Sequence, residues 1–173
     1  MKKSLLIVYT GNGKGKTTAA LGLMLRAWGR DLRVGMLQFL KSPDAGYGEY
    51  FAAEKLGLEI IPLGDGCTWN SQDMNVTVAL AQQAWQEAQQ RILSGSYDLL
   101  VLDEFTFPLH FGWLDTGQVV AWLKANRPEN LHLVITGRHA PEPLLETADL
   151  VTEVLEIKHP YQKGMLAQPG IEF

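Results

Sequence analysis

The sequence is poor in cysteine, in long apolar runs and in positive charge, and each shortage excludes a class of protein. Cys67 is the one cysteine among 173 residues, so no internal disulfide can form, and the four histidines do not group at zinc-site spacing. The apolar run at 5–8 is too short to span a bilayer or to form a signal peptide. A net charge of -4 argues against a nucleic-acid-binding face. We therefore expect a cytoplasmic protein with neither a nucleic-acid nor a membrane partner.

Strand-like and helix-like segments alternate along the chain without a repeat or a linker, which predicts a single domain over residues 1–173. Continuous apolar segments are typical of buried parallel strands, and helical spacing marks the segments between them. The expected strands lie at 5–9, 34–39, 58–63, 99–102, 131–136 and 150–157. The expected helices lie at 16–28, 74–93, 115–125 and 141–147.

This alternation predicts the α/β class. We expect a three-layer P-loop NTPase-like fold, with a mainly parallel central sheet and helices on both faces. In such a sheet, ligands bind at the carboxyl ends of the strands.

A glycine-rich loop follows the first expected strand and precedes the first expected helix, as in a phosphate-binding P-loop. Backbone N–H groups, a helix N-terminus and a lysine suit a triphosphate, and a threonine hydroxyl can ligate Mg²⁺. One position is unusual, because Thr10 stands where the first glycine of the common motif would be. The alternative is a glycine-rich turn that binds nothing. The predicted phosphate-binding residues are Gly11, Asn12, Gly13, Lys14, Gly15, Lys16, Thr17 and Thr18.

Two acids, Asp103 and Glu104, close the expected strand at 99–102. In P-loop proteins an acid at this place holds Mg²⁺ directly or through water. A neighbouring glutamate often serves as a base or as a second metal contact. The alternative is a pair of solvated acids at a strand end. Together with the P-loop, the pair predicts a metal site formed by Thr17, Asp103 and Glu104.

Further polar residues follow other expected strands. Gln38 and Lys41 follow the second strand and are predicted to bind the ligand. Arg138 follows the strand at 131–136 and can reach phosphate oxygens with two N–H groups, although a surface arginine is the alternative. Trp69 lies in a glycine-containing loop that suggests a binding lip, and its alternative role is to pack at the start of the next helix.

A dense aromatic stretch follows the acidic pair. Core packing is the default interpretation of such residues, and a wall for a large flat ligand is the alternative. The stretch contains Phe105, Phe107, Phe111 and Trp113.

Assembled, these motifs resemble those of the P-loop type of ATP:corrinoid adenosyltransferase, also called cob(I)alamin adenosyltransferase. The resemblance covers nearly the whole chain. Its residues lie at 10–20, 38–39, 41, 66, 68–69, 101–104, 135–138, 148–149, 158–159, 164, 167–168 and 170–173. The Gly-Asn-Gly-Lys-Gly-Lys-Thr loop and the carboxyl-terminal set are narrower signals than a general P-loop match.

The resemblance implies that a Co(I) corrinoid attacks the ribose C5′ of ATP and that the whole triphosphate leaves. The family holds ATP in the reverse sense along the loop, which suits the altered glycine spacing. Lys16, Thr17, Arg138 and Mg²⁺ (or Mn²⁺) would neutralise charge on the leaving triphosphate, and Glu104 would be metal-associated. The resemblance also implies catalytic roles for Lys16, Glu104 and Arg138, a reduced flavoprotein electron donor and a homodimer.

The chain departs from the family pattern at two places. Family members commonly carry an aromatic residue where this chain has Cys67, two residues before the matching Trp69. Those aromatics displace the lower cobalt ligand and make Co(II) easier to reduce. In this chain Phe105, Phe107 or Phe111 would have to displace that ligand instead. Many relatives also have a basic helical extension before the first strand, which we expect to be lacking here.

Two other functions are open on the residues alone. A P-loop kinase or ATPase would attack phosphorus and release ADP, whereas attack at C5′ releases triphosphate. A non-catalytic regulator that binds nucleotide or corrinoid would bind both ligands without turnover. The presence of Lys16, Thr17 and Glu104 argues against the regulator.

Overall fold

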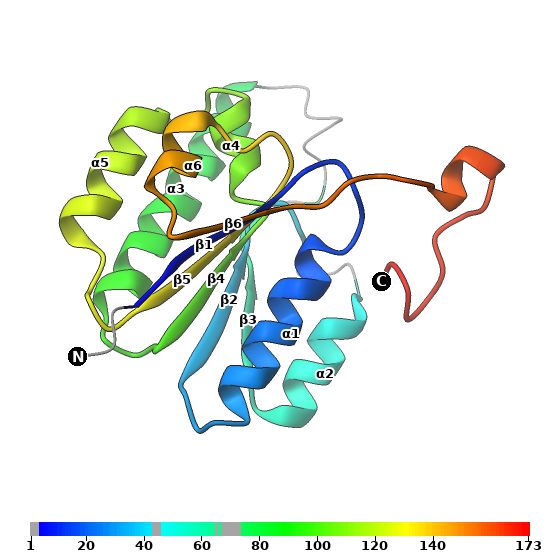
Figure 1. Ribbon diagram of the computed structural model, residues 1–173, viewed down its shortest axis with the longest axis horizontal. Coiled ribbons are helices and arrows are strands. Elements are labelled where there is room, and N and C mark those ends of the chain that lie inside the picture. The colour runs from blue at the N-terminus through cyan, green and yellow to red at the C-terminus, as the bar shows by residue number, and fades with distance from the viewer. Residues whose placement is uncertain (1–3, 43–45, 65, 67–73) are drawn as a thin grey trace.

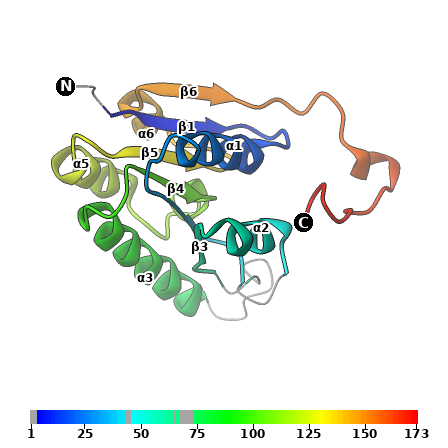
Figure 2. The same ribbon diagram turned by 90° about the horizontal axis from the view of Figure 1, so that it is seen from below.

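The structure is a computed structural model that describes residues 4–42, 46–64, 66 and 74–173. These residues form a six-stranded parallel sheet with helices on both faces (Figures 1 and 2). The strands follow the order β3-β2-β4-β5-β1-β6 across the sheet. They are β1 Leu6–Thr10, β2 Val34–Gln38, β3 Glu59–Pro62, β4 Leu99–Asp103, β5 His132–Thr136 and β6 Leu150–Glu153. The predicted α/β class with a parallel sheet is confirmed.

The helices are α1 Lys16–Trp28, α2 Gly48–Leu56, α3 Met74–Leu93, α4 Thr106–His110, α5 Thr116–Asn126 and α6 Glu142–Thr147, followed by a 3-10 helix, η2, at Pro160–Lys163. The predicted helix bounds at 16–28 and 74–93 are confirmed. Asp115 caps α5 as its sequence position suggested, because its carboxylate accepts a hydrogen bond from the Gln118 backbone N–H. Among the described residues, no helix is both long and apolar enough to cross a bilayer.

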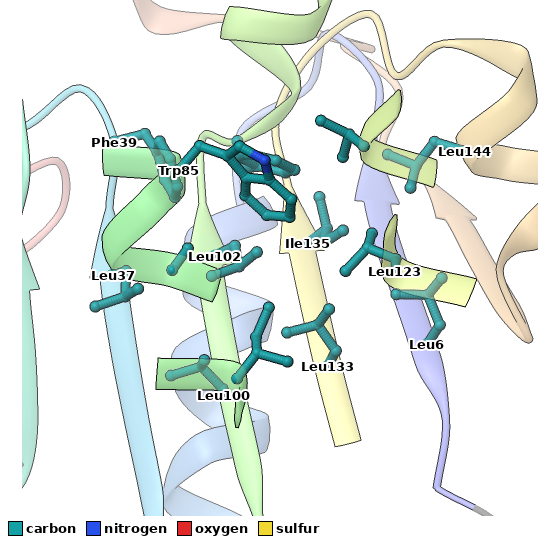
Figure 3. Packing of buried hydrophobic residues seen from close by; sticks show 14 of the residues in the cluster. Leu6, Leu37, Phe39, Trp85, Leu100, Leu102, Leu123, Leu133, Ile135 and Leu144 are labelled. Carbon is teal, nitrogen blue, oxygen red and sulfur yellow. The ribbon is translucent and has the colours of Figure 1, made fainter. Parts of the chain in front are cut away.

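Alternate residues of each central strand enter two separate cores. In β4, Leu100 and Leu102 pack with α3, α5 and α6, whereas Leu99 and Val101 pack against α1. This alternation explains why the central strands are apolar at every position. The larger core contains Trp85, which stacks on Phe105 at 5.1 Å (Figure 3). Both faces are thus buried, and the polar residues at the carboxyl edge of the sheet lie between two rigid layers.

The structure differs from the sequence prediction in four elements, one of which is the unpredicted 3-10 helix η2. The expectation missed α2, which begins at a glycine, and α4, whose five residues include Pro108. Pro108 is tolerated because the first turn of a helix needs no backbone donor there. The last strand was expected at 150–157 but ends at Glu153, since the chain then leaves the sheet and bonds to the P-loop. The following segment, orange to red in Figure 1, runs away from the sheet and returns towards α2.

Candidate active site

The P-loop connects β1 to α1 and offers an open helix N-terminus. Gly15 precedes α1 with a φ of 110°, gives no side-chain cap, and a Cβ placed on it would meet nothing within 4 Å. The first turn of α1 contains no acid, so no carboxylate of that turn competes with an anion for its free N–H groups. This open end of α1 therefore suits a phosphate group.

Two other loop glycines are required for a different reason. A Cβ on Gly11 would lie 2.5 Å from the carbonyl oxygen of Val154, and one on Gly13 would lie 2.6 Å from that of Leu155. The Gly13 N–H also donates to the Val154 carbonyl at 2.8 Å. Gly11 and Gly13 thus let the segment after β6 pack directly on the loop, while Gly15 leaves the other side open.

Lys16 lies nearly buried within the loop, at 6% exposure, and its ammonium group donates to the Gly13 carbonyl at 2.6 Å. Burial lowers the pKa of Lys16, and the nearby Glu104 carboxylate opposes this shift. A desolvated ammonium beside the open end of α1 interacts strongly with an anion, because little water screens it. Thr18, Asn12 and Lys14 are exposed, and Lys14 pairs with Glu172 at 2.8 Å.

Asp103 is fully buried at the end of β4, and both of its carboxylate oxygens accept hydrogen bonds. Its Oδ1 accepts from the hydroxyls of Thr17 at 2.9 Å and Thr136 at 2.7 Å. Its Oδ2 accepts from the Gln38 amide at 3.0 Å. The structure therefore brings the P-loop threonine and the strand-end acid into direct contact, as the predicted metal site requires.

Glu104 follows in a left-handed backbone conformation, with a φ of 58° that is uncommon for this residue type. Its N–H donates to the Thr136 hydroxyl at 3.0 Å, whereas its Oε2 is buried without a hydrogen-bond partner among the described residues. Burial, and next the Asp103 charge, raise the pKa of Glu104 to about 7. An unpaired buried carboxylate oxygen needs a donor or a cation.

This donor set fits a hard divalent cation such as Mg²⁺. Such an ion prefers oxygen ligands and usually keeps several waters and phosphate oxygens, so few protein ligands suffice. Among the described residues, no group of three or more His, Cys, Asp or Glu side chains forms a complete metal cage. The candidate protein ligands are the Thr17 hydroxyl and the Glu104 carboxylate, with Asp103 held behind Thr17.

Beside these residues lies a cleft of about 610 Å³. Glu104, Arg138 and Lys41 contribute its charged groups, so the structure brings three predicted site residues together. Phe107 and Phe111 lie on its wall, as the flat-ligand alternative requires, whereas Phe105 is fully buried in the core. Its remaining lining residues are Leu40, Tyr47, Gly66, His110 and His139.

Several residues of this region were given no role from the sequence. Thr136 bridges Asp103 and Glu104, and Glu49 on α2 accepts from Gln38 at 3.3 Å and pairs with Lys41. His110 and His139 stack at 4.4 Å on the cleft. Only Thr136 had a usable signal, because it ends a strand beside Arg138. Cys67 and Trp69 lie outside the described residues, so their predicted roles stay predictions. Lys158 is exposed, five residues beyond the end of β6.

Comparisons with known proteins point to one family. The model of the family "ATP:corrinoid adenosyltransferase BtuR/CobO/CobP" matches residues 2–173. A corrinoid adenosyltransferase of a Sinorhizobium species is 41% identical over 99% of this chain and 81% of its own length. Those of Pseudomonas aeruginosa and Escherichia coli K12 are 38% and 37% identical, over 85% and 87% of their lengths and 99% of this chain.

A solved structure, the flagellar accessory protein FlaH of Methanocaldococcus jannaschii, matches with a TM-score of 0.58 and 12% identity. The match covers 87% of this chain and 70% of FlaH, and it concerns the fold alone.

Proposed function

Since the chain belongs to the ATP:corrinoid adenosyltransferase family BtuR/CobO/CobP, we propose that the carboxyl edge of its sheet transfers the 5′-deoxyadenosyl group of ATP to a corrinoid. The enzyme is an alkyl transferase. The cobalt of the Co(I) corrinoid supplies an electron pair to C5′, a cobalt–carbon bond forms, and the C5′–oxygen bond breaks. The electron pair of that bond leaves with the triphosphate, so no proton or further reductant is needed in this step.

One observation carries the assignment of roles: the buried Lys16 ammonium, beside the open end of α1 and the Glu104 carboxylate. These groups suit a highly charged leaving group, because electrostatic stabilisation acts most strongly where water is excluded. Lys16 and the loop N–H groups bind the triphosphate, and Arg138 reaches it from the cleft. Proximity of C5′ to cobalt supplies the rest of the catalysis.

Mg²⁺ or Mn²⁺ completes the site in this proposal and, when bound, neutralises charge on the triphosphate. Glu104 Oε2 ligates it directly, since this oxygen has no other partner among the described residues. Asp103 already accepts three hydrogen bonds, so it orients the Thr17 hydroxyl instead. Lys41 binds the ligand from the cleft, whereas Gln38 is fully buried and holds Asp103 behind the site.

The flat corrinoid occupies the cleft beside Phe107 and Phe111. Trp69 and one of these phenylalanines make Co(II) easier to reduce. Since Phe105 lies in the core, Phe107 and Phe111 are the candidates to replace the aromatic residue that relatives carry at the position of Cys67. The Trp69→Ala variant should therefore lose far more rate on Co(II) corrinoid than on pre-reduced Co(I), and equal losses would make Trp69 structural.

The resemblance to the family also supports a homodimer, a reduced flavoprotein as electron donor and a cytoplasmic location. Sedimentation of the purified chain tests the homodimer. Reduction of Co(II) corrinoid by a reduced flavoprotein, with the chain and ATP present, tests the donor.

A product assay tests the reaction itself. Purified protein is mixed with ATP, Mg²⁺ and chemically reduced corrinoid, and the visible spectrum is followed while the nucleotide products are separated. We expect the spectrum of a cobalt–carbon bond together with inorganic triphosphate. ADP as the product would mean attack at phosphorus, and an unchanged spectrum would exclude adenosyl transfer.

A further inference from the structure

Glu49 is an acid that the proposed function does not use, although it touches two of the residues that the function needs. It is the second residue of α2, and its side chain is 14% exposed. Its Oε1 pairs with the Lys41 ammonium and accepts from the Gln38 amide nitrogen at 3.3 Å. Burial acts to raise the pKa of Glu49, but the hydrogen bond from Lys41, one from the Glu49 backbone N–H, the Lys41 charge and last the Gln38 amide together outweigh it, so the pKa lies below its ordinary value.

The Gln38 amide is fixed between two carboxylates. Its nitrogen donates both to Asp103 Oδ2 at 3.0 Å and to Glu49, and the side chain is fully buried. The opposite orientation of the amide would place its oxygen against two carboxylates, which is repulsive. Its oxygen has no hydrogen-bond partner among the described residues, so these two acids alone set the orientation.

Lys41 is fixed by the same carboxylate. The side chain of Lys41 is 18% exposed, its ammonium lies 4.2 Å from the centre of the Tyr47 ring, and it lines the cleft. A lysine side chain has four rotatable bonds, so an unpaired ammonium here would sample many positions. Pairing with Glu49 confines it to one.

We propose that Glu49 is a positioning residue of the adenosyl-transfer site, because its one carboxylate fixes the Lys41 ammonium in the cleft and the Gln38 amide against Asp103. This inference rests on the proposed function. The contacts form a continuous path from the cleft to the P-loop, through Lys41, Glu49, Gln38, Asp103 and Thr17. Glu49 itself neither gives nor takes a proton and forms no bond to substrate.

Positioning makes a prediction that a purely structural role does not. Removal of the Glu49 charge leaves the Lys41 ammonium uncompensated, so an anion should bind more tightly than before. The chemical step should slow, because Lys41 and Gln38 lose their fixed places. A variant that merely loosened the fold would weaken anion binding and turnover together.

The first experiment measures kcat with MgATP and Co(I) corrinoid, the affinity for inorganic triphosphate with Mg²⁺ by calorimetry, and the Tm. We expect Glu49→Ala to lower kcat about tenfold and Glu49→Gln to lower it less, since its amide oxygen still accepts hydrogen bonds. Triphosphate affinity should rise about threefold in Glu49→Ala, because Lys41 is then uncompensated. The matched control is Glu54→Gln, a change of the same charge at an exposed position of α2, which should leave all three values unchanged.

The second experiment repeats the calorimetry for Glu49→Ala in the Lys41→Met background. If Glu49 acts on Lys41, then Glu49→Ala should tighten triphosphate binding about threefold in the wild-type chain but not when Lys41 is absent. Equal effects in both backgrounds would overturn the inference, as would wild-type kcat in Glu49→Ala or a loss that follows the Tm. This cycle measures binding and needs no turnover. An inactive wild-type chain would therefore refute the proposed function, whereas the cycle would still test whether Glu49 acts on Lys41.

Discussion

At the amino end of the sheet, Arg33 and Asp98 join β2 to the segment before β4 in an exposed ion pair. At the carboxyl end, Lys16 lies buried and Glu104 is partly buried at the cleft. The Arg33 guanidinium donates twice to Asp98 and once to the Gly95 carbonyl, and the Asp98 backbone N–H returns a bond to the Arg33 carbonyl. Each side-chain nitrogen of Arg33 and each carboxylate oxygen of Asp98 is thus bonded. At the other end, one oxygen of Glu104 and one of Gln38 have no hydrogen-bond partner among the described residues.

This contrast shows how one sheet serves two purposes. A buried oxygen without a partner costs about 1–3 kcal/mol, so it is not retained for stability. An exposed ion pair adds little stability. Variants at the amino end should therefore change stability alone, and variants at the carboxyl end should change activity first.

Lys16→Ala should give the largest effect. We expect kcat to fall about 10²–10³-fold, as for the loss of one preorganised group that stabilises charge in the transition state. The Tm should stay equal or rise, because the variant no longer buries an ammonium. The rate of cobalt–carbon bond formation measures kcat, and thermal unfolding measures the Tm. Lys124→Ala, at an exposed site on α5, is the control. Unchanged turnover in Lys16→Ala would exclude its triphosphate role.

Glu104→Gln should lower activity about 10–100-fold, in the range seen when groups around a metal are altered. It should also change the pH dependence of stability without nucleotide or metal. The folded chain holds the Glu104 proton up to about pH 7, whereas the ordinary glutamate value is 4.5. The wild-type chain should therefore lose about 1–3 kcal/mol relative to Glu104→Gln as pH rises from 4.5 through 7.

Urea unfolding at a series of pH values measures this difference. Addition of Mg²⁺ and ATP at pH 8 should stabilise the wild-type chain more than Glu104→Gln, because the variant lacks the carboxylate proposed to hold Mg²⁺. Parallel stability curves for the two proteins would show that the Glu104 carboxylate is not desolvated.

Thr136→Val should lower both the stability and the activity, because Thr136 lies at the carboxyl end of the sheet but is part of its buried hydrogen-bond network. The change keeps the shape of the side chain but removes the donor to Asp103 and the acceptor for the Glu104 N–H. We expect a loss of about 1–3 kcal/mol in unfolding free energy and a fall in activity. Thr152→Val, on the exposed strand β6, should change neither. Full activity in Thr136→Val would mean that Asp103 and Glu104 need no bridge.

Asp98→Asn should give the smallest effect. It should lower the Tm by no more than about 2 °C and leave kcat unchanged, since the ion pair is exposed and remote from the site. Hydrogen bonds from Arg33 hold the pKa of Asp98 below its ordinary value of 3.8. The stability that it contributes is therefore present above that pH and is lost as the pH falls further. Thermal unfolding near pH 7 and pH 3 checks this. Reduced turnover in Asp98→Asn would contradict the view that the amino end of the sheet affects stability alone.

Much of the fold could be predicted from the sequence because burial on both faces makes parallel strands apolar without interruption. The P-loop and the acids after β4 were likewise visible, since their chemistry is local in the chain. Glu49 was not, because its role depends on α2 folding back beside Gln38, and its own neighbourhood has no distinguishing pattern. The overlong prediction for β6 has a related cause: Leu155 and Ile157 continue the apolar pattern, yet they lie outside the sheet, at 64% and 83% exposure.

The contact between the P-loop and the segment after β6 has a consequence for how this protein can be engineered. Val154 and Leu155 occupy the space that side chains at Gly11 and Gly13 would need. A loop transplanted from another nucleotide-binding protein would therefore fit only if it had glycines at the same two positions. Otherwise the segment that follows the last strand would have to be transplanted from the same protein. Chimeras should be cut so that residues 10–18 and 150–155 come from one parent.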